Sequence, residues 1–141
     1  MKNSLQTLSR IEKFNINEQR KILVALQEQQ DAVILELKNL NLRFEQEKEF
    51  NRQHNLIGDF GAYVKRYLEQ KEQLENHIAE LEAEIENVRG IIADMYKEQK
   101  TFEIIDDNRQ KRAQHEEDLK LQKQLDEIGT NNYIKHRDQT N

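Results

Sequence analysis

Apolar residues recur along two stretches of the chain at alternating steps of four and three. The first stretch, which includes one polar position, consists of Leu23, Leu26, Gln30, Val33, Leu37, Leu40 and Phe44. The second consists of Leu74, Ile78, Leu81, Ile85, Val88, Ile92 and Met95. This spacing places each set on one narrow face of a helix, as in the a and d positions of a coiled coil. The sequence therefore predicts an all-α fold, a long two-helix antiparallel coiled-coil hairpin with a C-terminal helical overhang.

The boundaries of the two helices follow from turn-forming residues. Asn55, Gly58 and Asp59 favour a turn at about 55–60. We expect one coiled-coil domain over 1–141, with helices at about 5–55 and 60–128 and a frayed tail at 129–141. Ser4 is the candidate N-cap of the first helix. The stop signals of the second helix are Gly129 and the pair Asn131-Asn132.

The seam becomes polar toward both termini. Ser9, Glu12 and Gln19 occupy seam positions in the first helix, so this end is expected to be the looser one. Beyond Phe102 the heptad positions are polar, and they are Asp106, Arg109, Glu116 and Lys123. Leu121, Leu125 and Ile128 then restore the spacing in a shifted register. We expect this last segment to need a partner that buries its apolar stripe.

Composition supports paired helices rather than a globular core or a disordered chain. Hydrophobic and charged residues each make up 35% of the 141 residues, with no proline and four glycines. A two-helix seam needs only about two apolar residues in seven, and disordered chains lack a sustained apolar repeat. No cysteine is present, and neither a signal peptide nor a membrane span is predicted. We therefore expect a soluble, cytoplasmic protein without direct membrane insertion.

The net charge of −5 argues against binding to nucleic acid. The acidity is concentrated in residues 56–96, which carry 4 basic and 9 acidic side chains. This segment is either an ordinary solvated face or a strip that faces a partner. The pattern alone leaves both interpretations open.

The sequence carries no arrangement typical of an enzyme. Its four histidines are scattered, without the spacing of a zinc hydrolase, and there is no phosphate-binding glycine loop. The carboxylate clusters Asp106-Asp107 and Glu116-Glu117-Asp118 lie on predicted solvated helices, which offer no pocket that could shift their pKa values. We expect no catalytic site, no metal and no cofactor.

Aromatic residues gather around the predicted turn. Phe60, Tyr63 and Tyr67 follow it at helical spacing, and Phe44 and Phe50 precede it. They either close the end of the hairpin or form an exposed anchor for another protein. Tyr96 and Phe102 are expected to pack on the seam.

Six segments distributed over nearly the whole chain are typical of one protein family. They are Leu5 to Phe14, Phe60-Gly61-Ala62-Tyr63, Leu81 to Arg89, Tyr96 to Glu103, Asn108-Arg109-Gln110 and Leu125-Asp126-Glu127-Ile128. Through them the chain resembles the flagellar export protein family called FliJ. The order and spacing of these segments are more specific than any one of them.

The resemblance implies a non-enzymatic stalk of the flagellar type III protein export apparatus, at the cytoplasmic face of the inner membrane. Its implied partners are the hexameric export ATPase, the membrane export gate protein and export chaperones, and the free chain is expected to be a monomeric hairpin. The implied ATPase-ring contacts are Arg109, Arg112, Leu121, Leu125 and Ile128. The implied export-gate contacts are Val33, Leu37, Leu40, Phe44, Tyr63, Tyr67, Leu74 and Ile78. Several of these eight also belong to the predicted seam, so their assignment to core or contact stays open.

Three other functions fit the same pattern. The chain could be the equivalent stalk of a virulence type III secretion system. It could instead be a coiled-coil chaperone similar in outline to a prefoldin subunit, although the connection at 54–60 is too short for the β-hairpins of that class. A generic scaffold whose helices pair between chains is the third alternative.

Overall fold

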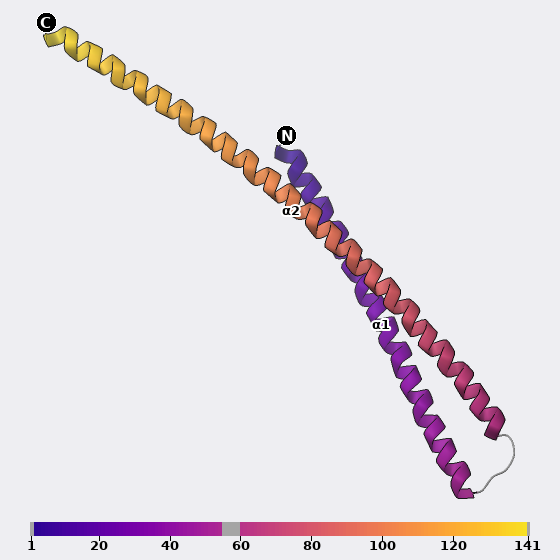
Figure 1. The fold of residues 1–141 in the computed structure, drawn as a ribbon. Helices are drawn as coiled ribbons and strands as arrows, with labels where there is room; N and C mark the ends of the chain where they lie inside the picture. The colour runs from indigo at the N-terminus through magenta and orange to yellow at the C-terminus, as the bar shows by residue number, and fades with distance from the viewer. Residues whose placement is uncertain (1, 55–59, 141) are drawn as a thin grey trace. The chain divides into compact units, whose positions relative to one another are not determined.

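Two long α-helices make up the described structure. The computed structural model describes residues 2–54 and 60–140. Helix α1 spans Lys2–His54, and helix α2 spans Phe60–Thr140. They run in opposite directions along the hairpin (Figure 1). The predicted all-α helical hairpin is confirmed.

Contacts within the chain divide it into two units. The larger is the continuous segment Glu12–Tyr96, and the smaller combines Met1–Ile11 with Lys97–Asn141. Each unit contains residues of both helices, of which α1 is 53 residues long and α2 is 81. The predicted turn at about 55–60 falls, apart from Phe60, outside the described residues.

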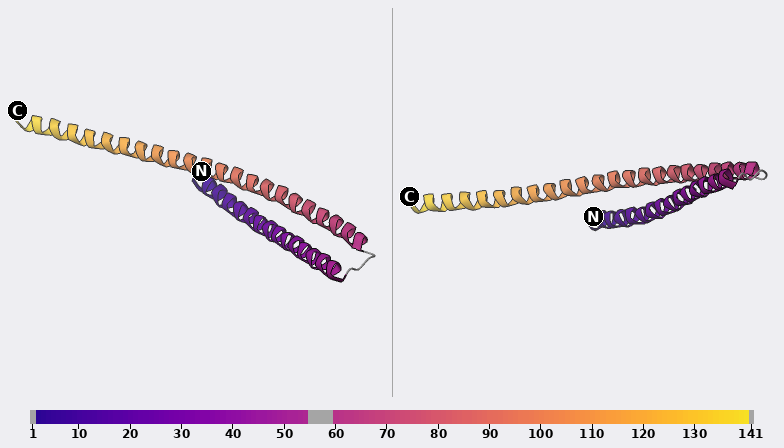
Figure 2. Two further views of the ribbon diagram at one scale, coloured as in Figure 1. Left: turned by 60° about the horizontal axis from the view of Figure 1, so that its bottom comes forward. Right: turned by 90° about the horizontal axis from the view of Figure 1, so that it is seen from below.

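The unit Glu12–Tyr96 is held together by the predicted seam. Its two helices lie side by side in each view (Figure 2). The buried side chains lie at positions of the four-three repeats of the two helices, and they are Ile16, Val33, Leu40, Tyr67, Leu81, Ile85, Val88 and Ile92. Ile85 is the most enclosed of them, with 1% of its surface exposed. Both predicted stripes are confirmed, since each of their remaining members is half-buried.

The smaller unit has a more polar seam. Its half-buried side chains are Leu5, Ser9, Gln99, Phe102 and Asp106. The Oδ1 atom of Asp106 is buried and has no hydrogen-bond partner among the described residues. A buried carboxylate oxygen without a partner costs stability, and Oε1 of Glu12 in the larger unit is in the same state.

The predicted ends of the helices were wrong in two places. Ser4 is not an N-cap, because α1 already begins at Lys2. The segment 129–140 is not a frayed tail, because α2 continues through Gly129 to Thr140. Gly129 does not adopt the left-handed backbone that ends many helices. Without that conformation and without a following proline, a glycine only weakens a helix by about 1 kcal/mol.

Ile85 should contribute more to stability than any exposed isoleucine. We expect Ile85→Ala to lower the free energy of unfolding by about 2–4 kcal/mol, because it leaves a cavity in the seam. Ile34→Ala, at a position 45% exposed, is the matched control and should cost less than about 1 kcal/mol. Urea unfolding followed by circular dichroism measures both. Equal losses would show that the seam does not dominate stability.

Candidate partner-binding surfaces

A stack of aromatic rings joins the two helices near the turn. The Phe44 ring lies 3.9 Å from the Tyr67 ring, with an angle of 7° between their planes. It also stacks at 6.2 Å with Tyr63 and at 6.4 Å with Phe60. The predicted cluster is therefore present, and its rings close the seam at this end. Phe50 does not join it, because its exposed ring stacks on His54 at 4.1 Å.

Two polar contacts fix the register of the helices. The Tyr67 hydroxyl donates a hydrogen bond of 2.6 Å to Oδ1 of Asn41. Farther along the seam from the turn, Nε2 of Gln30 on α1 donates a bond of 2.8 Å to the Glu82 carboxylate on α2. Sliding either helix by one position would break both bonds, so polar seam residues specify one alignment.

Grooves open along the seam beside the aromatic stack. One has a volume of about 370 Å³ and is lined by Glu36, Leu40, Arg43, Tyr63, Gln70, Gln73 and Leu74. A second of about 260 Å³ is lined by Leu40, Tyr63, Arg66, Tyr67 and Gln70. Their lining mixes apolar, amide and charged side chains, as protein interfaces do.

The eight predicted gate contacts all lie on the hairpin seam. Val33, Leu40 and Tyr67 are buried, with 8–9% of their surface exposed, and present little area to a partner. The other five are half-buried: Leu37, Phe44, Tyr63, Leu74 and Ile78. Leu40, Tyr63, Tyr67 and Leu74 line the two grooves. The structure thus brings these residues together, chiefly as the core of the hairpin.

A second apolar surface lies on α1 and was missed in the sequence. Ile34, Leu35 and Leu42 are 45–56% exposed. A shallow groove of about 390 Å³ runs between Ile34, Leu37, Lys38, Asn41, Leu42 and Glu45. The available signal was the excess of apolar residues in Val33-Ile34-Leu35 and around Leu40, more than a two-in-seven seam uses. Exposed apolar patches of this kind mark protein contacts.

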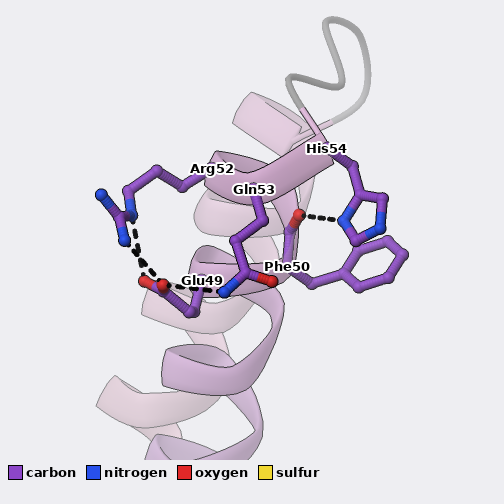
Figure 3. A network of polar contacts seen from close by, with 5 residues as sticks. All are labelled: Glu49, Phe50, Arg52, Gln53 and His54. Atoms are coloured by element: carbon purple, nitrogen blue, oxygen red, sulfur yellow. Dashed lines mark hydrogen bonds and ion pairs between the residues drawn. The ribbon is translucent and has the colours of Figure 1, made fainter.

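A polar network ends α1. The Glu49 carboxylate accepts hydrogen bonds of 3.1 and 2.7 Å from the Arg52 guanidinium and one of 3.3 Å from Gln53 (Figure 3). Chiefly through the Arg52 bonds, the pKa of the Glu49 carboxyl is held below its usual value. Stability from this pair is present at neutral pH and is lost as the pH falls through the lowered pKa. Both groups are solvated, so the contribution is small.

Tyr96 corrects one prediction about the seam. Its side chain is 40% exposed rather than packed between the helices. The Arg20 guanidinium lies 5.3 Å from the centre of its ring, a cation–π contact. Tyr96 follows Met95 directly, so the helix turns it away from the seam position that Met95 occupies. Phe102, by contrast, is half-buried.

The predicted ring contacts form a different kind of surface. Every side chain from 107 to 139 of α2 is exposed. Leu121, Leu125 and Ile128 are exposed by 55–58%, and Arg109 and Arg112 precede them on the same helix. A regular apolar stripe without packing partners among the described residues is typical of a helix that binds another protein.

Neither metal chemistry nor a membrane span is found in the described residues. No group of three or more His, Cys, Asp or Glu within 2–54 and 60–140 is placed to hold a metal ion. Over the same two ranges, neither helix has a stretch sufficiently long and apolar to cross a membrane. Comparison of the chain with protein-family models, curated proteins and solved structures finds no match in any of the three.

The Tyr67 hydroxyl should be measurably coupled to Asn41. We expect Tyr67→Phe to lower the free energy of unfolding by about 1 kcal/mol, because the ring stack remains while the Asn41 oxygen loses its donor. In a chain that already carries Asn41→Ala, Tyr67→Phe should leave the free energy of unfolding nearly unchanged, and a double-mutant cycle measures this coupling. Tyr63→Phe, which removes a hydroxyl from the neighbouring ring of the stack, is the control. Full additivity of the Tyr67 and Asn41 changes would contradict the coupling.

Proposed function

We propose that the chain is a non-enzymatic stalk of the flagellar type III export apparatus. The single observation that carries the proposal is that α2 combines two different segments. Over Glu12–Tyr96 it is paired with α1 along a packed seam, and from 107 to 139 all its side chains are exposed. A component that links two partners needs one segment that is stable by its own packing. It needs a second segment whose exposed apolar residues can be buried by a partner.

The distribution of residues supports a division of labour between the two segments. The exposed stripe Leu121, Leu125 and Ile128, with Arg109 and Arg112, is proposed to enter the export ATPase hexamer. A helix face that offers apolar side chains and cations suits a contact with the inner surface of a ring. The resemblance of the chain to the FliJ family supports the same assignment.

The hairpin is proposed to bind the export gate protein. Here Tyr63 and Leu74 line a groove between the helices, and Leu37 lines the α1 groove together with the exposed Ile34 and Leu42. Buried Val33, Leu40 and Tyr67 keep the surface in register rather than contact the gate. Binding of export chaperones is part of the same proposal.

The ring contact can be tested with point variants. The chain should raise the hydrolysis rate or the hexamer fraction of its cognate export ATPase. We expect the triple change Leu121→Gln, Leu125→Gln and Ile128→Gln to abolish that effect, as truncation after Ile104 should, because the buried apolar contact is lost. Circular dichroism should show that the hairpin remains helical.

Leu119→Gln provides the matched control for the ring contact. Leu119 is 52% exposed on the same helix, but it lies outside the four-three stripe. We expect it to leave the stimulation of the ATPase unchanged. No stimulation by the native chain would contradict the stalk function. A deletion strain that stays motile would point instead to the equivalent stalk of a virulence system.

The gate contact is tested on the α1 groove. Ile34→Asp and Leu42→Asp should each weaken binding to the soluble part of the export gate protein by about tenfold, because a charge replaces an apolar contact at a protein interface. Val24→Asp, also on α1 and 51% exposed, should leave binding unchanged. Titration calorimetry measures the affinities. Equal weakening by all three would indicate a general loss of helix stability.

A further inference from the structure

The end of α2 carries a stripe that is complementary to itself. Four-three spacing continues on both sides of the three apolar residues, through Asp118 before them and through Asn132 and Lys135 after them. All six side chains are exposed. The Asp118 carboxylate accepts a hydrogen bond of 2.9 Å from Gln114, which occupies the preceding position of the same stripe. An acid therefore lies at one end of the apolar stripe and a base at the other.

We propose that this segment pairs with the same segment of a second copy of the chain, in antiparallel orientation. In the alignment that places Leu125 of one copy opposite Ile128 of the other, the central layers are apolar in both copies. Leu121 then faces Asn132, and Asp118 faces Lys135. Two-fold symmetry gives each layer twice, so the seam holds six apolar side chains and an ion pair at each end.

Charge selects this alignment over the alternatives. A parallel pair would place Asp118 opposite Asp118 and Lys135 opposite Lys135, and like charges at facing seam positions are destabilising. An antiparallel pair shifted by one heptad would place Ile128 opposite Asp118 and Lys135 opposite Lys111. Asn132 reinforces the choice, since one polar residue in a seam often specifies register.

The pairing is expected to be weak because only three apolar residues of each copy take part. It does not depend on the proposed function, since it concerns the chain alone. The family resemblance implies that the free chain is a monomer. The proposed dimer differs from that expectation, because the packing of the hairpin leaves the stripe at the end of α2 exposed.

The proposal is tested by sedimentation velocity of the full-length chain at concentrations up to about 1 mM. The native mass should rise from one copy to two with concentration. Asp118→Lys or Lys135→Asp alone should weaken dimerisation by about tenfold or more, and the combined change should restore it, because the ion pair is then reversed. Lys123→Asp is the control, as Lys123 lies off the stripe, and it should leave the dimer unchanged. A single-copy mass at every concentration, or no restoration in the combined variant, would overturn the pairing.

The orientation is tested separately by cross-linking. The natural chain has no cysteine, so single cysteines report cleanly on the dimer. A mixture of Leu121→Cys and Asn132→Cys chains should form the mixed disulfide on oxidation in preference to either symmetric one. Preferential formation of the symmetric disulfides would indicate parallel pairing and overturn the antiparallel arrangement.

Discussion

The burial of a narrow apolar seam between α1 and α2 governs the rest of the hairpin. Each helix alone is largely charged and polar, so most of its stability has to come from the face that it packs against the other. Ile85 and its neighbours Leu81 and Val88 form the most enclosed part of that seam. Because these residues hold the helices in one register, the aromatic stack at Phe44 and Tyr67 can meet across the hairpin. The candidate gate surface depends on the same alignment, since its grooves are lined by residues from both helices.

Polar residues lie on the seam of both units, and some of them find a hydrogen-bond partner while others do not. In Glu12–Tyr96, Gln30 and Tyr67 find partners on the other helix, and those bonds reward a single register. In the smaller unit one oxygen of Asp106 is bonded to Gln110 on its own helix, and the other is buried without a partner among the described residues. The satisfied contacts specify one register of the larger unit. The larger unit also contains a buried oxygen without a partner among the described residues, Oε1 of Glu12, so an unsatisfied carboxylate lowers stability in both units.

The paired segment could be predicted well from the sequence, because a sustained four-three repeat places its apolar residues on one face of a helix and on no regular face of a strand. Every member of the two stripes is buried or half-buried.

The prediction failed where it relied on single residues rather than on a repeat. Gly129 resembled a helix stop, but its backbone does not adopt the left-handed conformation with which glycine ends many helices, and the sequence does not reveal that. The exposed Ile34 and Leu42 lie off the seam period, so the four-three repeat gives no sign of them. Spacing alone also cannot separate a core position from a contact position, and the candidate gate residues share one spacing.

The exposed stripe of α2 gives the two proposals a common physical basis. Leu121, Leu125 and Ile128 have no packing partner within the described chain, so exposure to water disfavours them until another surface covers them. A second copy and a partner ring would both cover these side chains, and they exclude each other because the same atoms are used. Self-pairing would then lower the apparent affinity of the chain for the ring, because only the fraction of chains that is monomeric could bind. Weak pairing is compatible with binding to the ring. A weak dimer covers the stripe at high concentration of the chain, and it dissociates when a partner buries more of the apolar area. A tight dimer would compete with the ring at every concentration, so the shortness of the apolar stripe is consistent with both roles.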